Sequence, residues 1–150
     1  LLAFKDLKIR SILLHNSLTD LLLGLNFPSV LKYYSEHIKQ KYNVRPGFCT
    51  LSSYSLMKTL NQINLNDQVV MAPINPIGFQ MNPEKKMVEN ELVKFKSDFI
   101  AMSVLAAGSV SPQKSYDYLQ KFNNLNSIVI GASTSSHLNS IVKVFSKYLD

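Results

Sequence analysis

The sequence predicts an α/β fold in which parallel β/α units form the later part of a (β/α)8 barrel of the TIM type. Short apolar blocks recur at intervals of roughly thirty residues, the length of a βαβ unit, and segments with helical spacing lie between them. The blocks are apolar throughout, which is typical of strands covered on both faces. We expect five strands, at Ser11–Leu14, Gly47–Leu51, Gln68–Met71, Asp98–Met102 and Ser127–Ile130.

The helices between these strands have recognisable start signals. Asn82–Glu84 supplies a cap, then a proline at the first helical position and an acid in the first turn, and Ser111–Gln113 repeats the cap and the proline. Phe27–Ser29 opens a helix expected to reach about Lys41. Two further helices are expected, one from Ser53 to Asn61 and one from a cap at Ser135 or Ser136 through Tyr148.

The choice between an open doubly wound sheet and a barrel depends on the first strand. No G-x-G-x-x-G turn follows it, so the nucleotide-binding open sheet lacks its main sequence signature. A complete barrel takes about 250 residues. We therefore interpret residues 1–150 as one unit, the carboxyl-terminal portion of a barrel, and the first residue, Leu1, suggests a fragment or a processed product. Unpaired sheet edges then predict self-association or pairing with the missing part of the barrel.

Composition narrows the class of protein. A hydrophobic content of 46% with 17% charged residues predicts a packed domain, and the apolar runs fall short of the ~20 residues needed to cross a bilayer. The single cysteine, Cys49, fits a reducing compartment, and we expect a cytoplasmic protein that does not bind membranes. The net charge of +6 comes from scattered lysines without interleaved aromatic residues, so we expect no nucleic-acid partner.

In such folds the functional groups lie where strands end. After the last strand, Gly131 permits close backbone approach, and Ser133 to Ser136 supply hydroxyls and amides at the positive end of a helix. This junction suits a phosphate group, although an ordinary serine-rich cap is the alternative. The junction Val104–Pro112 is small and uncharged, which permits either a ligand against the backbone or tight loop packing. The long, nearly uncharged loop Met71–Asn82 is predicted to form a pocket wall, and a loop packed beneath its neighbours is the alternative.

Three histidines and one cysteine could carry chemistry. His15 ends the first strand, where an imidazole can donate to a carbonyl oxygen or act as a general acid, and a structural histidine is the alternative. His37 and His137 lie on helices without metal-ligand spacing and are predicted to be surface residues, so no metal site is expected. Cys49 has no histidine or acid nearby in sequence and is predicted to be a buried thiol.

Five motifs in chain order resemble the carboxyl-terminal half of an aldo-keto reductase. The first, Ser11–Asn16, is similar to the family's Leu-x-Leu-x-His run, and His15 matches its histidine. The others resemble the family's Gly-x-Ser-Asn-Phe-Ser, Asn-Pro-Leu, Ile-Ala-Tyr-Ser-Pro-Leu-x-x-Gly and Pro-Gly-Ala-Ser-Ser-Pro-x-His-Leu motifs. They are Gly47–Ser52, Asn75–Ile77, Ile100–Gly108 and Ile130–Leu138.

The resemblance implies an oxidoreductase with an NADP-type cofactor and a carbonyl substrate that His15 orients and polarises. It assigns the cofactor to Cys49, Thr50, Met71, Met102, Leu105, Gly108, Ser109, Gly131, Ser133 and Ser135. Several of these depart from the family. Cys49 and Thr50 replace a Ser-Asn pair and Met71 a glutamine, which hold the nicotinamide amide, while Met102 replaces the tyrosine that stacks on the ring. Ile141 stands where an asparagine reads adenine.

Positions that make polar contacts to the cofactor in the family thus hold apolar side chains here. The family's catalytic Tyr, Asp and Lys belong to the first half of the barrel. Two alternatives to a reductase stay open. One is a non-catalytic barrel fragment that acts as an assembly module. The other is a barrel lyase or isomerase that acts on a phosphorylated substrate.

Overall fold

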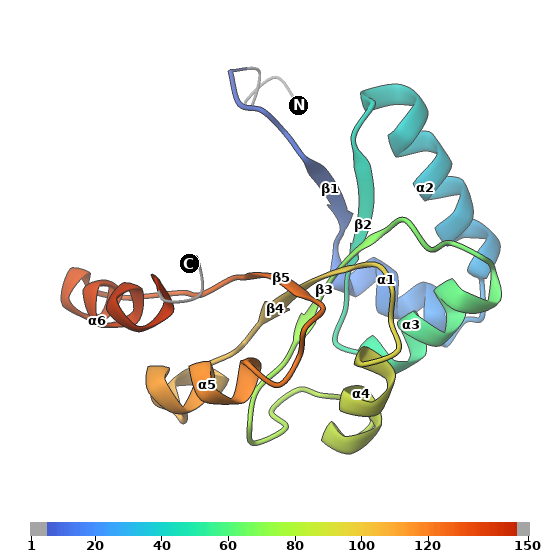
Figure 1. Ribbon diagram of the computed structural model, residues 1–150. Helices are drawn as coiled ribbons and strands as arrows, with labels where there is room; N and C mark the ends of the chain where they lie inside the picture. Colours follow the sequence, from blue (N-terminus) through green and yellow to red (C-terminus); the bar gives the residue numbers. More distant parts are fainter. Residues whose placement is uncertain (1–5, 147–150) are drawn as a thin grey trace.

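A computed structural model describes residues 6–146 and contains one five-stranded sheet (Figure 1). All neighbouring strands are parallel, and their order in the sheet is their order in the chain. This sequential order is that of a β/α barrel, because doubly wound sheets reverse direction at a switch point. The strands are β1 (Ser11–Leu14), β2 (Arg45–Cys49), β3 (Val69–Pro73), β4 (Asp98–Met102) and β5 (Leu125–Ile128). The predicted fold class is confirmed.

Helices follow the strands and lie along one side of the sheet, from α2 to α6 (Figure 1). Their amphipathic faces pack on the sheet through fully buried leucines such as Leu56, Leu92 and Leu119. The helices are α1 (Asn16–Gly24), α2 (Pro28–Tyr42), α3 (Ser53–Gln62), α4 (Lys85–Leu92), α5 (Pro112–Leu119) and α6 (Ser135–Phe145), with a short 3₁₀ helix, η2 (Ala106–Gly108).

The two faces of the sheet differ in burial. Phe48, Val70 and Phe99 are in register on adjacent strands, and all three are fully buried beneath the helices. Because side chains alternate along a strand, the next residue of β3 and β4 points to the opposite face. Met71 and Ile100 lie there in register, and both are only partly buried. The helix-facing side therefore forms the core, and the other side corresponds to the interior of a barrel.

Charged side chains gather at the amino ends of the strands. Arg45 pairs with Asp98 and, at 3.3 Å, with Asp67, which also lies 3.2 Å from Lys39. These side chains are between 40% and 66% exposed, so the network contributes little to stability. The carboxyl ends of the strands, at the opposite end of the sheet, hold the residues predicted to be functional.

Two predicted helix starts are wrong. The expected first residue, Pro83, follows a cis peptide bond, Glu84 is the N-cap, and α4 begins at Lys85. Asn82 is not a cap, because its side-chain amide donates to the Leu51 carbonyl at 3.1 Å. The cap of α6 is Thr134 rather than Ser135 or Ser136. The predicted end of that helix, Tyr148, lies outside the described residues.

Other boundaries differ by a few residues. The crossover from β1 to β2 contains two helices where the sequence predicted only the second, since α1 begins directly after β1. β2 ends at Cys49, and β5 ends at Ile128 rather than Ile130. The Ser111 cap is confirmed, because its hydroxyl accepts the Lys114 amide at 3.3 Å and Pro112 is the first helical residue.

Candidate functional site

A cavity of about 620 Å³ lies at the carboxyl ends of β4 and β5, in the size range of small-molecule sites. The exit loops of both strands form its walls, and one aromatic side chain from the loop between β3 and α4 completes it. The lining residues are Phe79, Met102, Ser103, Val104, Leu105, Ala106, Ala107, Gly108, Val129, Ile130, Gly131, Ala132, Ser133 and His137. They include five residues that the sequence assigned to a cofactor: Met102, Leu105, Gly108, Gly131 and Ser133.

The β4 exit loop forms an apolar wall of the cavity, because hydrogen bonds within the loop already use its backbone amides. The amide of Gly108 donates to the Leu105 carbonyl at 2.9 Å, and that of Ser109 donates to Ala106 at 3.1 Å. Ala107 has a φ value of 55° and Gly108 a φ value of 89°. A glycine adopts such a positive φ without strain, and Gly108 does so here. The amides of Gly108 and Ser109 are therefore already bonded within the loop, and Ser109 does not line the cavity.

The segment that leads into α6 lines the same cavity through Ser133, and α6 lines it through His137, whereas Ser135 does not line it. Thr134 accepts the amide of His137 at 3.1 Å, which satisfies one of the first-turn amides. The amides of Ser135 and Ser136 have no acceptor inside the helix, as at every helix start. Within residues 6–146, the hydroxyls of Ser133 and Ser135 make no hydrogen bond. This end of the cavity can hold an anion through hydroxyls, amides and the helix dipole.

His137 and Phe79 line the cavity, although neither was named as a binding residue from the sequence. His137 was expected on the surface, but it is half-buried and lines the cavity. Phe79 belongs to the loop predicted as a pocket wall, and the weak charge of that loop was the only signal for it. His37 is exposed as predicted, and its ring stacks on Tyr33 with centroids 6.2 Å apart.

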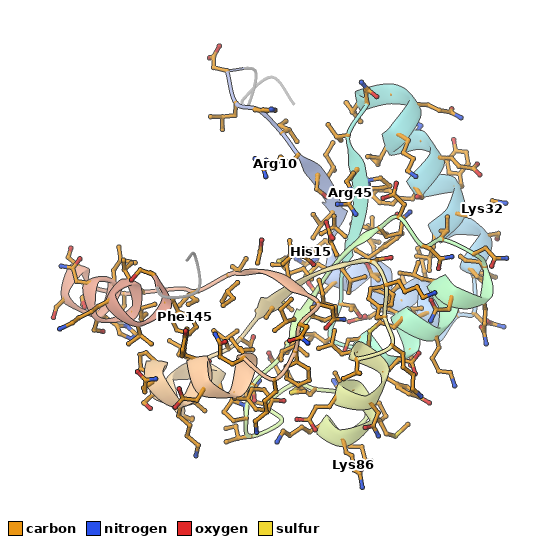
Figure 2. The ribbon with its side chains drawn as sticks, in the orientation of Figure 1. Arg10, His15, Lys32, Arg45, Lys86 and Phe145 are labelled. Carbon is orange, nitrogen blue, oxygen red and sulfur yellow. The ribbon has the colours of Figure 1, made fainter. Side chains whose placement is uncertain are left out.

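His15 lies at the carboxyl end of β1, and Figure 2 shows it and Arg10 at the two ends of that strand. Its Nδ1 accepts the Ser17 amide at 3.3 Å, so the imidazole is the N-cap of α1. A neutral imidazole that accepts at Nδ1 carries its proton on Nε2, which is then free to donate. His15 is exposed and does not line the cavity between β4 and β5.

Two solved structures share this architecture, and both are described as a “putative aldo-keto reductase” from Pseudomonas aeruginosa. They match 95% of this chain with TM-scores of 0.63 and 0.64, at 16% sequence identity. The fold is that of part of an aldo-keto reductase barrel. The chain spans 53% of the length of the matched chains, so it corresponds to about half of such a protein. No protein-family model and no curated protein matches the sequence.

In this half-barrel, the residues that follow β2 form a structural joint, by which we mean a set of hydrogen bonds that connects α1 to the start of α3. The Asp20 carboxylate accepts the Thr50 hydroxyl and, at 3.0 Å, the Leu51 amide. The Thr50 hydroxyl also accepts the Ser52 amide at 2.8 Å, and Thr50 is completely buried. The polar groups of Thr50 are thus bonded between α1 and the start of α3.

The adjacent ends of β2, β3 and β4 are apolar. Cys49 is buried, and its Sγ lies 3.9 Å from Sδ of Met102, although β3 separates the two strands. Burial raises the pKa of the Cys49 thiol above its ordinary value, which keeps it protonated and weakens it as a nucleophile. Met71 lies between them in register with Cys49. This group meets the cavity at Met102, whereas Cys49, Thr50 and Met71 do not line it.

Between residues 6 and 146, no group of three or more His, Cys, Asp and Glu side chains could hold a metal ion. No helix in the same range is long and apolar enough to cross a membrane.

Proposed function

We propose that this chain is the carboxyl-terminal part of an oxidoreductase of the aldo-keto reductase type, that the β4–β5 cavity receives an NADP-type cofactor, and that His15 faces a carbonyl substrate. One observation carries the proposal. The cavity joins the hydroxyl of Ser133, which is unbonded among the described residues and lies just before α6, to an apolar and aromatic wall at the carboxyl end of a sheet with the fold of an aldo-keto reductase. A cytoplasmic location is part of the proposal and rests on the composition with its single cysteine.

The phosphate groups of such a cofactor fit the start of α6. Ser133 supplies a hydroxyl in the cavity, and the first-turn amides of α6 are further donors without an acceptor inside the helix. No lysine or arginine lines the cavity, so the anion would depend on these neutral donors and on the helix dipole. We therefore expect modest affinity, with a strong dependence on added negative charge at this helix end.

The nicotinamide end fits less completely. A ring can lie on Met102, but Met71 and Cys49 offer only sulfur atoms, and the hydroxyl of Thr50 is bonded to Asp20. Ile141 is 3% exposed, packs in the core and has no side-chain group that could form a hydrogen bond with an adenine. Loss of the amide contacts weakens binding by about 1 kcal/mol for each hydrogen bond. A bound NADPH would supply the hydride, while these side chains would only orient its ring.

The proposed role of His15 follows from its cap. Because Nδ1 accepts the Ser17 amide, the imidazole plane is fixed and Nε2–H is the free donor. A donor held in this way can polarise a carbonyl oxygen without being protonated first. His15→Gln, which keeps a donor but loses this fixed geometry, is expected to lower the turnover number more than substrate affinity.

A polypeptide partner is the second part of the proposal. Each edge strand borders an apolar groove: one of about 330 Å³ between α1 and α2 and one of about 450 Å³ beside β5 and α6. Leu18 and Leu21 are half-exposed in the first, as are Leu138 and Val142 in the second. We propose that further strands and helices, from the rest of a barrel or from a second copy, cover both edges. The 150-residue chain should self-associate in light scattering, and a monodisperse monomer would contradict this.

Fluorescence titration of the full-length protein with NADPH tests the cofactor. Ser133→Asp should raise Kd about tenfold, because a carboxylate in the cavity beside the helix start repels a phosphate. Melting temperature should not fall, since an acid at this position stabilises a helix. Asn139→Asp is the matched control, because it adds the same charge on α6 outside the cavity. No NADPH binding by the full-length protein would remove the reductase proposal.

One alternative is tested by the same binding measurements, because the end of the cavity near α6 fits a phosphate better than the opposite end fits a nicotinamide ring. A lyase or isomerase that acts on a phosphorylated substrate needs only the start of α6 and no amide contacts at Cys49 or Met71. Inorganic phosphate would then raise the melting temperature, Ser133→Asp would abolish the rise, and NADPH would not bind. An assembly module would show neither effect.

A further inference from the structure

Phe79 is an aromatic residue at the cavity wall that remains 39% exposed. Single exposed apolar residues are common, so exposure alone indicates nothing. Ile77 on the same loop is 53% exposed and does not line the cavity. Phe79 differs because it lines the cavity together with Met102 and because its backbone is fixed in place.

The fixing residue is Asn75, which is completely buried. Its Nδ2 donates to the Phe79 carbonyl and its Oδ1 accepts the Phe79 amide, both at 2.8 Å. One side chain thus holds both backbone groups of Phe79. The next residue, Gln80, accepts the Ser103 hydroxyl at 3.4 Å, which ties this loop to the exit of β4. The ring is therefore presented to the cavity without a loss of loop entropy on binding.

The neighbouring wall suits the face of a planar ring. Met102 supplies a polarisable thioether, which packs well against aromatic groups. The exit loop of β4 adds small side chains, Ala106 and Ala107, which let a flat group lie close to the backbone. The unbonded hydroxyl of Ser133 lines the same cavity. The cavity thus combines an aromatic wall with an anion-binding end.

We infer that Phe79 binds the planar heteroaromatic ring of a phosphate-bearing ligand, with the phosphate at the start of α6. The inference rests on the proposed function, for which it names the ring-binding residue. The resemblance to the family places a stacking aromatic residue on β4, where this chain has Met102. Phe79 supplies an aromatic surface from the preceding loop instead, and Asn75 is its positioning residue.

The test measures Kd for two probes with the full-length protein: NADPH, which has a ring and phosphates, and inorganic pyrophosphate, which has only phosphates. Phe79→Ala should weaken NADPH binding about tenfold, the usual loss when a stacking aromatic is removed. Pyrophosphate binding should stay within about twofold, as for a surface substitution. Phe79→Tyr keeps the ring and should bind NADPH like the parent. Ile77→Ala is the matched control and should change neither Kd.

Equal NADPH affinity of Phe79→Ala and the parent would overturn the inference and leave the cofactor proposal intact. If NADPH fails to bind at all, flavin mononucleotide serves as a second planar, phosphorylated probe. Binding of that probe that depends on Phe79 would support the inference while the reductase proposal falls. Failure of both planar probes would overturn the inference. Asn75→Ala should weaken ring binding and leave pyrophosphate binding unchanged if Asn75 acts through Phe79.

Discussion

The exits of β2 and β5 are both rich in hydroxyl groups and lie at the same end of the sheet, but they use these groups differently. At β2, the Thr50 hydroxyl is buried and bonded to Asp20 and Ser52. At β5, Ser133 lines a cavity with its hydroxyl unbonded among the described residues. Residue type is thus a poor guide to a binding site. What distinguishes the exits is whether another part of the fold already satisfies the donors.

The largest expected effect tests whether the β2 exit is a structural joint. Asp20→Ala removes the acceptor of the Thr50 hydroxyl and of the Leu51 amide, and leaves both donors near the core. Hydrogen bonds to a charged group predict a loss of about 3 kcal/mol in the free energy of unfolding. Urea denaturation measures it, with Asp117→Ala on the exposed face of α5 as the control. A loss as small as that of the control would show that the joint is not structural.

A pair of glycines sharpens the same comparison. A Cβ at Gly47 in β2 would lie 2.5 Å from the Val69 carbonyl oxygen, whereas a Cβ at Gly131 would meet nothing within 4 Å. Gly47→Ala should therefore cost about 2 kcal/mol of stability through overpacking. Gly131→Ala should leave the unfolding midpoint unchanged while its methyl group occupies part of the cavity. Equal midpoints for the two variants would contradict the close packing of β2 against Val69 at Gly47.

The smallest effect concerns Cys49, next to the β2 joint. Because burial raises the pKa of its thiol, iodoacetamide should modify Cys49 more slowly in the folded protein than in urea at the same pH. The apparent pKa of the reaction should also be higher in the folded state. Since the folded thiol holds its proton more tightly, stability should fall as pH rises above the ordinary thiol pKa. Reaction rates that are identical in both states would show that the thiol is accessible and unperturbed.

The parallel order of the sheet could be predicted from the sequence, because continuously apolar blocks and intervening helix signals are local features. The bounds of β4 agree with the prediction at both ends. By contrast, α1 was missed since it follows His15 without a turn, and the expected helix start at Pro83 was wrong because Asn82 bonds to Leu51, a distant residue. Such long-range hydrogen bonds leave no pattern in the local sequence.

Some residues of the candidate site could likewise be predicted from the local sequence, and others could not. Gly131 and Ser133 could be predicted because small and hydroxyl residues after a strand are a local signal, and both line the cavity. The loop that carries Phe79 was predicted to form a pocket wall, but Phe79 itself was not singled out, because its place in the wall depends on the buried side chain of Asn75. His137 was taken for a surface residue because the exit loop of β4, which forms the facing wall, is distant in sequence.

The sequential order of the strands has a consequence for biosynthesis. From β2 to β5, each strand pairs with the strand made just before it, so its template is already present when it leaves the ribosome. Among these five strands, no pairing waits for a strand encoded much later. The growing chain can therefore assemble from its amino end, one unit at a time, with β5 as the last strand of the five to find its place.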